Sequence, residues 1–453
     1  MPSFTAEELA RWTGAQWQSA PPKELIGLNF DTRTLKPGEG FVALTHGARD
    51  GHTFIKQAIS KGAVCAIVER PCPVNLPQLL VPNSMEALSL IGSACRQNFK
   101  GTVLGITGSC GKTSTKSMLH AILALQGCHS TPGNWNNLIG VPMTLFGLNS
   151  AEHTYGVVEA GISCPNEMGQ LGEMIAADLV LVTQLSASHL KGLGSMEMIA
   201  YEKSRLIAKA KPDAKVILTD SVLREPHFQA FAERTILVTE SNANIEGLKP
   251  AKQVVFNETA GGIEILGKEY SLASSSRGMR SNAALAIVAA HELGLESSVI
   301  QEAIARWQPD FYRGSSFVSE GQFYYLDCYN ANPASMEDSL QAFVKDAPNE
   351  SARGYVLGAM NELGELAETF HYKIAEGIQV RAEDRLWFVG PSDLIEAYRE
   401  GALMSGFKKE QIQCVTSVEK IKSEVADFSG ALFLKGSRSY NLEFLLPQSL
   451  NLK

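Results

Sequence analysis

The sequence predicts an α/β protein of three domains, and three observations support this prediction. The chain has 453 residues, of which 45% are hydrophobic, and this is more than one core normally holds. Short apolar runs typical of buried strands alternate with segments of helical period, a pattern that favours parallel sheets covered by helices. The alternation restarts twice, so we expect domains over residues 1–99, 100–311 and 312–453.

The first domain is expected to be a small α/β unit. Its strand-like runs are "GEGFVALT", "VCAIVE" and "PQLLVP", and its helical segments are "HTFIKQAISKGA" and "SMEALSLIGSACRQNF". The runs are short, so the sheet should be small.

The central domain is expected to be a parallel sheet with an added β-hairpin region. Its buried-strand runs are "GTVLGITG", "YGVVEAG", "ADLVLVTQL" and "AKVILTD". Between about residues 250 and 275 two alternating runs, "KQVVFNE" and "GGIEILGKEYSL", are joined by "TAGG", which predicts a hairpin. The helical run "NAALAIVAAHELGL" then closes the domain.

The last domain is expected to be a doubly wound, Rossmann-like sheet. Its strands "QFYYLDC", "GYVLGAM", "RLWFVG" and "ALFLKGS" are separated by helical stretches. In such folds the ligand binds at the carboxyl ends of the strands. No long flexible linker separates the domains, so we expect them to touch and a ligand site to lie between them.

Composition restricts the possible partners. The net charge is −8 and no run of Lys or Arg occurs, which argues against nucleic acid or an anionic membrane as the main partner. The chain shows neither a secretory signal pattern nor an apolar run of membrane-spanning length, so we expect a cytoplasmic protein without a membrane span. Its eight cysteines are irregularly spaced and are expected to be reduced thiols.

The stretch "TGSCGKTS", residues 107–114, follows a predicted strand and leads into a helix. Gly108 and Gly111 allow the tight turn in which successive N–H groups converge on a phosphate. Lys112 supplies a cation for the outer phosphates, Thr113 a hydroxyl for Mg²⁺, and the helix beginning near Ser114 its positive dipole end. The pattern therefore predicts a mononucleotide-binding P-loop. The alternative is a glycine turn with an exposed lysine.

The helix after this loop is expected to bury one apolar face. That face comprises Met118, Leu119, Ile122, Leu123 and Leu125, and Gly127 should end the helix.

Three further residues could take part in the chemistry. Glu159 ends an apolar strand, where a Mg²⁺ ligand would lie. His189 lies in the Ser/Gly-rich stretch "TQLSASHLKGLGS", and Lys203 lies in the helical "IAYEKSRL". Each also has a simpler explanation: a solvated rim carboxylate, a structural loop histidine and a helix-surface lysine.

Two strand ends in the last domain are rich in polar residues. In "YLDCYNANPASM", Asp327 ends a strand, and Asn330 and Asn332 lead into a helix that begins with Pro333. In "LFLKGSRSYN", Lys435, Gly436, Ser437 and Arg438 form a cationic strand end suited to a carboxylate or phosphate. Both stretches could also be simple turns.

Taken in order, these stretches resemble the ATP-dependent Mur ligases of peptidoglycan synthesis along the whole chain. "TGSCGKTS" is similar to the family P-loop T-G-[ST]-x-G-K-[ST]. "GNWNNLIGVPMTL" and "DCYNANPASM" resemble signatures of the family member that adds D-alanyl-D-alanine, and the D-N-P-R stretch of the diaminopimelate-adding member is missing. "NFDTRTLKPGEGFVAL" resembles the N-terminal element that holds the uridine end of the substrate.

The resemblance implies roles for individual residues. It implies ATP contacts at Gly108, Ser109, Gly111, Lys112, Thr113, Ser114, Asn282, Arg313 and Asp327. It implies two Mg²⁺ ions, served by Thr113, Glu159, His189 and Lys203, with Lys203 carbamylated (N6-carboxylated). It implies substrate contacts at Asp31, Thr32, Arg33, Asn134, Asn136, Asn137, Asn330, Asn332, Lys435 and Arg438. Lys112, Lys203, His189 and Arg313 would be the catalytic residues, Arg313 by reaching the γ-phosphate.

The implied activity is ATP-dependent amide formation by a monomer. An acyl phosphate of UDP-N-acetylmuramoyl tripeptide would be attacked by the amine of D-Ala-D-Ala, through a tetrahedral intermediate, and the last domain would close during the cycle. The third residue of the tripeptide, diaminopimelate or lysine, is left open. One alternative is a ligase similar to folylpolyglutamate synthase, and the other is a non-catalytic nucleotide-binding homologue.

One departure from the family pattern favours the second alternative. Where the family reads G-R-H-N-x-x-N, this chain has "SRGMRSN", with Gly278 and Met279 in place of His and Asn. Arg277 and Asn282 are retained, so the contacts to adenine are expected to differ. Cys110 and Cys328 take positions often filled by serine, and no reactivity is assigned to them.

Overall fold

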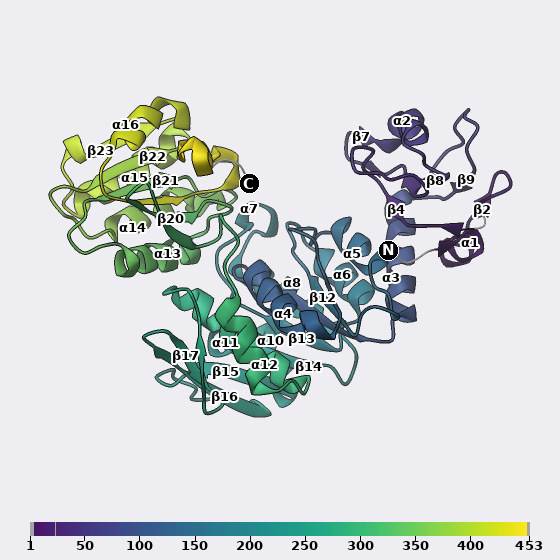
Figure 1. The fold of residues 1–453 in the computed structure, drawn as a ribbon, viewed down its shortest axis with the longest axis horizontal. Coiled ribbons are helices and arrows are strands. Elements are labelled where there is room, and N and C mark those ends of the chain that lie inside the picture. The colour runs from purple at the N-terminus through teal and green to yellow at the C-terminus, as the bar shows by residue number, and fades with distance from the viewer. Residues whose placement is uncertain (1–3, 23, 451–453) are drawn as a thin grey trace.

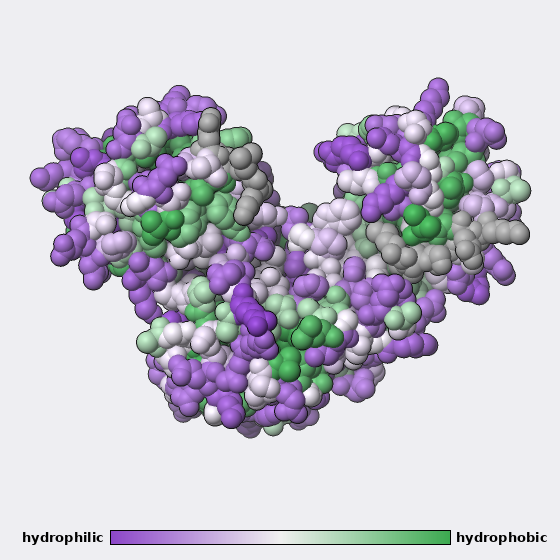
Figure 2. Space-filling model, in the orientation of Figure 1, coloured by the Kyte–Doolittle hydropathy of each residue, from purple (hydrophilic) through white to green (hydrophobic). Residues whose placement is uncertain are grey.

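The computed structural model describes residues 4–22 and 24–450. It contains three large sheets, each with its own helices, besides two two-stranded pairs, and the central unit lies between the other two (Figure 1). The space-filling view shows a hollow above the central unit, between the N-terminal and C-terminal units (Figure 2). The predicted fold class is thereby confirmed.

The N-terminal sheet has the strand order β2-β9-β8-β5-β4. Its strands are β2 (Gln16–Trp17), β9 (Gln78–Leu80), β8 (Cys65–Val68), β5 (Gly40–Val42) and β4 (Leu28–Asn29). Two short pairs flank it, β1 (Phe4–Thr5) with β3 (Glu24–Leu25) and β6 (Thr45–His46) with β7 (Arg49–Asp50). The helices are α1 (Ala6–Thr13), α2 (Ile55–Ser60) and α3 (Ser84–Asn98). Helix α1 was not predicted, although Thr5 and Glu8 form a capping box at its start.

Helix α3 joins the N-terminal unit to the central one. A Cβ built on Gly92 would lie 3.0 Å from the Pro142 Cα, so α3 packs closely on α5 (Gly140–Phe146). One turn further toward the C-terminal end of α3, the buried Arg96 side chain donates to the Ile175 carbonyl at 2.9 Å and to the Asp178 carboxylate at 2.8 Å. These contacts attach the first sheet to the side of the central unit.

The central sheet has nine strands in the order β11-β12-β10-β13-β14-β15-β16-β17-β18. They are β11 (Cys128–Ser130), β12 (Tyr155–Glu159), β10 (Thr102–Thr107), β13 (Leu179–Val182), β14 (Lys215–Thr219), β15 (Thr235–Glu240), β16 (Lys252–Thr259), β17 (Gly262–Ile265) and β18 (Lys268–Ser271). Its helices, besides α5, are α4 (Lys112–Leu123), α6 (Glu167–Ile175), α7 (Leu190–Leu193), α8 (Met196–Ala208), α9 (Asp220–Leu223), α10 (Pro226–Gln229), α11 (Arg277–Glu292) and α12 (Ser297–Arg306). Strands β11 to β16 are parallel, so their carboxyl ends meet along one edge.

Two details of the central unit differ from the prediction. The added region is a three-stranded meander rather than a hairpin, because "GGIEILGKEYSL" turns at Leu266 and Gly267, both with positive φ, and forms two strands. Leu125 does not belong to the buried face of α4. The helix ends at Leu123, and Leu125 in the following 3-10 turn is 88% exposed.

The C-terminal sheet has the order β19-β20-β24-β21-β22-β23. Its strands are β19 (Ser315–Ser319), β20 (Gln322–Asp327), β24 (Ala431–Lys435), β21 (Arg353–Gly358), β22 (Arg385–Val389) and β23 (Ile412–Val415). Its helices are α13 (Pro333–Asp346), α14 (Ala367–Glu376), α15 (Ser392–Met404) and α16 (Lys422–Asp427). All pairs are parallel except β19 with β20. The predicted doubly wound sheet is present, and the edge strands β19 and β23 were not predicted.

Two further predictions concern the cysteines and membrane-spanning helices. All eight cysteines are free thiols, as predicted. Within the described residues, every helix is too short or too polar to cross a membrane.

Candidate active site

The loop between β10 and α4 carries the predicted phosphate-binding residues. Gly108 has φ +148° and Gly111 has φ +82°, conformations that favour glycine. A Cβ at Gly108 would lie 2.0 Å from the Thr183 Oγ1, and a Cβ at Gly111 would lie 2.3 Å from the Asn282 Oδ1. Ser109 donates its backbone N–H to the Gln184 carbonyl at 2.6 Å. Neighbouring strands and α11 therefore fix the loop, and only glycine fits its two turning points.

Two lysines meet at this loop, Lys112 half-buried and Lys203 buried. Lys112 Nζ donates to the Gly108 carbonyl at 2.6 Å, and Lys203 Nζ donates to the same carbonyl at 3.0 Å. Burial lowers the pKa of Lys112. Burial, and then the Lys112 ammonium, lower the pKa of Lys203 well below its usual value. Lys203 is 1% exposed, so it is not the surface lysine of the simpler explanation.

Glu159 is buried at the end of β12 and faces the start of α4. Its Oε1 accepts from Thr113 Oγ1 at 3.2 Å and from Asn136 Nδ2 at 2.8 Å. Its Oε2 accepts no hydrogen bond but forms an ion pair with Lys116 Nζ at 3.2 Å. The buried Glu159 carboxylate is therefore already paired with a cation, the ammonium of Lys116. Glu159 is not the solvated rim residue of the simpler explanation.

His189 is held from the C-terminal unit. It is half-buried at the start of α7, has φ +55°, and its Nδ1 contacts the Glu362 carboxylate. Glu362 also has a left-handed backbone, φ +63°, and its carbonyl accepts the Lys191 N–H at 3.0 Å. Burial lowers the pKa of His189, and this effect is larger than the opposite effect of the Glu362 carboxylate, which raises the pKa. A neutral ring whose Nδ1–H faces a carboxylate leaves Nε2 free as an acceptor.

The C-terminal unit presents a buried ion pair at the ends of β20 and β24. Asp327 Oδ2 accepts from Ser339 Oγ at 2.6 Å and from Lys435 Nζ. Lys435 is 1% exposed and also lies 3.4 Å from the Asn330 carbonyl. Because Lys435 neutralises Asp327, it acts first as a structural partner of that carboxylate.

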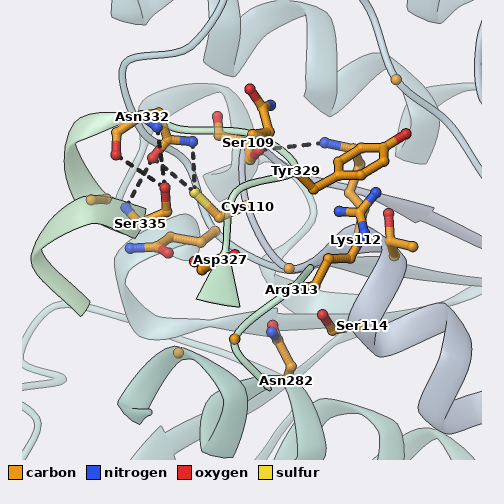
Figure 3. A pocket seen from close by; sticks show the side chains of 18 of the residues that line it. Ser109, Cys110, Lys112, Ser114, Asn282, Arg313, Asp327, Tyr329, Asn332 and Ser335 are labelled. Atoms are coloured by element: carbon orange, nitrogen blue, oxygen red, sulfur yellow. Dashed lines mark hydrogen bonds between the residues drawn. The ribbon is translucent and has the colours of Figure 1, made fainter. Parts of the chain in front are cut away.

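Two residues from the C-terminal side of the sequence reach the phosphate loop. The Arg313 guanidinium lies 3.7 Å from the centre of the Tyr329 ring, which holds it over the cleft (Figure 3). The Asn332 side chain caps α13 by accepting from Ser335 N at 3.0 Å, and its Nδ2 lies 3.0 Å from the Cys110 sulfur. The cleft is therefore bounded by both units.

One cavity of about 400 Å³ collects most of the predicted residues. Its lining includes Ser109, Gly111, Lys112, Thr113, Ser114, Asn134, Asn136, Asn137, Glu159, His189, Asn282, Arg313, Asp327, Asn330, Asn332 and Lys435. Gly108 and Lys203 lie behind its wall, in contact with each other. Arg438 is not part of the lining, since it pairs with Glu443 and lies 5.5 Å from the centre of the Tyr312 ring.

The predicted uridine-binding residues lie apart from this cavity, on the N-terminal unit. Arg33 is bound to Asp31 at 2.6 Å, with an Arg33 side chain that is 84% exposed, and Thr32 donates to Gln57 at 2.9 Å. The contact toward the central unit is made by Phe30, whose ring centre lies 5.8 Å from that of Trp135. Trp135 belongs to the same loop as Asn136, so this loop links the two units.

Three residues of the site were missed at the sequence level. Lys116 lies beside Glu159, Glu362 beside His189, and Asp338 beside Gly278. Lys116 follows Lys112 by one helical turn, a spacing that could have indicated a second cation at the loop. Nothing in the local sequence marks Glu362 or Asp338, because their partners are more than 50 residues away.

The candidate metal ligands do not yet form a complete set. Among the residues described, no three His, Cys, Asp or Glu side chains come together as a metal site. Glu159 and Thr113 adjoin each other, whereas His189 is paired with Glu362.

Burial raises the pKa of Cys328 to about 12, which makes this thiol unreactive at neutral pH.

The parallel sheet, the fixed glycine loop and the two-sided cleft define a P-loop nucleotide-binding protein with a Rossmann-like third domain. The chain belongs to the Mur ligase family. Residues 106–290 match the model of the Mur ligase middle domain, and residues 315–438 match that of the Mur ligase, glutamate ligase domain.

Relatives extend this similarity over the whole chain. The UDP-N-acetylmuramoyl-tripeptide--D-alanyl-D-alanine ligase of Bacillus subtilis is 30% identical over 92% of this chain and 91% of its own. The enzyme of the same name from Escherichia coli is 29% identical over 98% of this chain and 97% of its own. The crystal structure of MurF from Acinetobacter baumannii matches with a TM-score of 0.84 and 25% identity, over 98% of both chains.

Proposed function

We propose that this chain is an ATP-dependent ligase that joins D-alanyl-D-alanine to UDP-N-acetylmuramoyl tripeptide in peptidoglycan synthesis. The observation that carries the proposal is the end-to-end similarity to relatives named for this reaction. The cleft supports it, because the phosphate loop and the polar strand ends of the third domain face the same cavity. The expected cytoplasmic location and monomeric state remain predictions from the sequence.

The chemical problem is that a carboxylate resists attack by an amine. Transfer of the γ-phosphoryl group of ATP to the tripeptide carboxylate gives an acyl phosphate and ADP. The amine of D-Ala-D-Ala then attacks the acyl carbon, and the tetrahedral intermediate loses phosphate and a proton to leave the amide. Catalysis of this kind depends mainly on positioning and charge stabilisation.

Phosphate positioning falls to the P-loop and the arginine of the opposite wall. The loop N–H groups and Lys112 would hold the outer phosphates. Lys112 already lies against the loop carbonyls, so it must swing outward when ATP binds. Arg313, held over the Tyr329 ring, would approach the γ-phosphate from the boundary of the third domain. Asp327 and Asn282 would contact the nucleoside.

Thr113, Glu159, His189 and Lys203 fit two Mg²⁺ ions only if Lys203 is modified. Glu159 Oε2 pairs with Lys116, so a Mg²⁺ ion at this carboxylate would have to displace that ammonium. A bare Lys203 ammonium would repel a cation, whereas the lowered pKa of Lys203 favours the neutral amine, the form that adds CO₂ to become an anionic carbamate. Bound Mg²⁺ would offset the charge of the transferring phosphoryl group.

The remaining predicted contacts divide the substrates among the units. Asp31, Thr32 and Arg33 would hold the uridine end, and Asn134, Asn136 and Asn137 would line the path of the peptide. Asn137 also caps α5, since its Oδ1 accepts from Gly140 N at 2.9 Å. Asn330, Asn332 and Lys435 would receive the dipeptide, and Arg438 would need to leave Glu443 to join them.

The test is phosphate release from ATP with purified UDP-N-acetylmuramoyl tripeptide, with and without D-Ala-D-Ala. Release that requires both, with a pentapeptide product by mass spectrometry, is the expected result. A parallel reaction with folate and glutamate tests the folylpolyglutamate alternative. ATP binding without release in any reaction would support the non-catalytic alternative and overturn the proposal. Tripeptides ending in diaminopimelate and in lysine should both be assayed.

A further inference from the structure

The family departure at Gly278 coincides with a contact between the central and C-terminal units. Ser276 Oγ donates to Asp338 Oδ2 at 2.6 Å, and Gly278 N donates to Asp338 Oδ1 at 3.0 Å. Ser276 is the N-cap of α11, and Asp338 lies in the second turn of α13. A carboxylate of the third domain thus binds the N-terminus of a 16-residue helix of the second, where the helix dipole favours it.

Gly278 is what makes room for this carboxylate. A Cβ at residue 278 would lie 2.8 Å from Asp338 Oδ2. Any larger residue there, including the His of the family pattern, would compete with Asp338 for the same space. Since the φ of Gly278 is not in the left-handed region, the glycine is needed for space and not for its backbone conformation.

The position of Asp338 matches the nucleoside end of a bound nucleotide. Asn282 touches the phosphate loop at Gly111. Gly278 lies one helical turn, about 6 Å, from Asn282 toward the N-terminal end of α11. Gly278, Asn282 and Asp338 all line the cleft that contains the loop. The base of a nucleotide whose phosphates occupy the loop should therefore reach the neighbourhood of Asp338.

The chemistry of Asp338 suits one feature of adenine. Each carboxylate oxygen has two acceptor positions, and each oxygen of Asp338 uses one of them within the protein. One acceptor on each oxygen is left for a donor in the cleft, such as the 6-amino group of adenine. Asp338 is half-buried, so water competes only in part for this position.

We propose that Asp338, for which Gly278 leaves room, accepts a hydrogen bond from the 6-amino group of ATP. This hydrogen bond would replace a contact to the base that the residues of the family pattern make. This inference rests on one part of the proposed function, namely that ATP binds in the cleft. It makes Asp338 a specificity-determining residue that the third domain contributes to a site on the second.

The test is a comparison of affinities of the full chain for ATP and for purine riboside triphosphate, which lacks the 6-amino group. Affinities are measured with Mg²⁺ and without peptide substrates, for the wild type, Asp338→Ala and Gly278→Ala. Glu350→Ala removes the same charge from an exposed position beyond the end of α13 and is the control. Gly278→Ala keeps the carboxylate but displaces it, and thermal unfolding reports whether each variant is folded.

The wild type and the control should bind ATP about five- to tenfold more tightly than the analogue, the effect of one hydrogen bond. In both Asp338→Ala and Gly278→Ala that preference should fall below about twofold. An unchanged preference in the folded variants, or an equal loss of affinity for both nucleotides, would overturn the inference and leave Asp338 as a tie between domains. Failure of the wild type to bind ATP would instead overturn the proposed function, and the inference with it.

Discussion

The two walls of the cleft are built in different ways. On the central wall, Gly108, Gly111 and Lys112 lie within five consecutive residues and are fixed by neighbouring strands. On the C-terminal wall, the groups that reach across come from separate places in the sequence, among them Glu362, which contacts His189, and Asn332, which contacts Cys110. Phosphate binding is therefore a local property of the sequence. The groups that the third domain adds to the site depend instead on the position of that domain.

The largest loss is expected on the central wall, from Lys112→Ala. Removing the cation of the phosphate loop should lower kcat at least about 10³-fold, because charge on the transferring phosphoryl group is no longer stabilised. Stability should change little, since the cost of partly desolvating the ammonium offsets its hydrogen bonds to the loop carbonyls. Phosphate release and thermal unfolding check this, with the exposed Lys100→Ala as control. Turnover at the wild-type rate would remove the phosphate loop from the account.

Lys203→Ala should lower kcat about 10²-fold, the usual cost of losing support at a metal site. If the carbamate is the functional form, short-chain carboxylic acids should partly restore activity by placing a carboxylate in the vacated space. The control is Lys209→Ala at the C-terminal end of the same helix, where the lysine pairs with Glu173 at the surface. Full activity without added acid would exclude the carbamate.

Glu362→Gln tests the C-terminal wall and should lower kcat about tenfold. The amide keeps the shape but weakens the hold on His189, so Mg²⁺ activation should require a higher concentration. Glu365→Gln in the same exposed loop is the matched control. Equal effects of the two substitutions, or an unchanged Mg²⁺ requirement, would mean that the pair only joins the domains.

The smallest effect is expected where the two walls touch at Cys110. Cys110→Ser should change kcat less than about twofold, because the loop uses backbone N–H groups and the smaller hydroxyl can still meet Asn332. Steady-state kinetics before and after a thiol-blocking reagent check this. A tenfold loss would show that the sulfur contact itself controls domain closure.

The sequence was sufficient for the fold class and the central wall, because strands, glycines and Lys112 carry local signals. It failed at edge strands such as β19 and β23, which are short and half-exposed, and at Leu125, where the helix ended earlier than its apolar period indicated. It could not locate Glu362 or Asp338, because contacts across domains leave no periodic pattern. It also gave no sign that Lys435 neutralises Asp327, which only the adjacent β20 and β24 reveal.

The proposed function requires that the reacting carboxylate be activated by phosphoryl transfer from ATP before the amide forms. The most direct measurement is the fate of ¹⁸O placed in the reacting carboxylate of UDP-N-acetylmuramoyl tripeptide. We expect one ¹⁸O atom in each phosphate released, and one labelled phosphate for each pentapeptide formed. The carboxylate oxygen that attacks the γ-phosphorus stays bonded to phosphorus when the amine displaces phosphate. Pentapeptide formed with unlabelled phosphate would contradict the acyl-phosphate route.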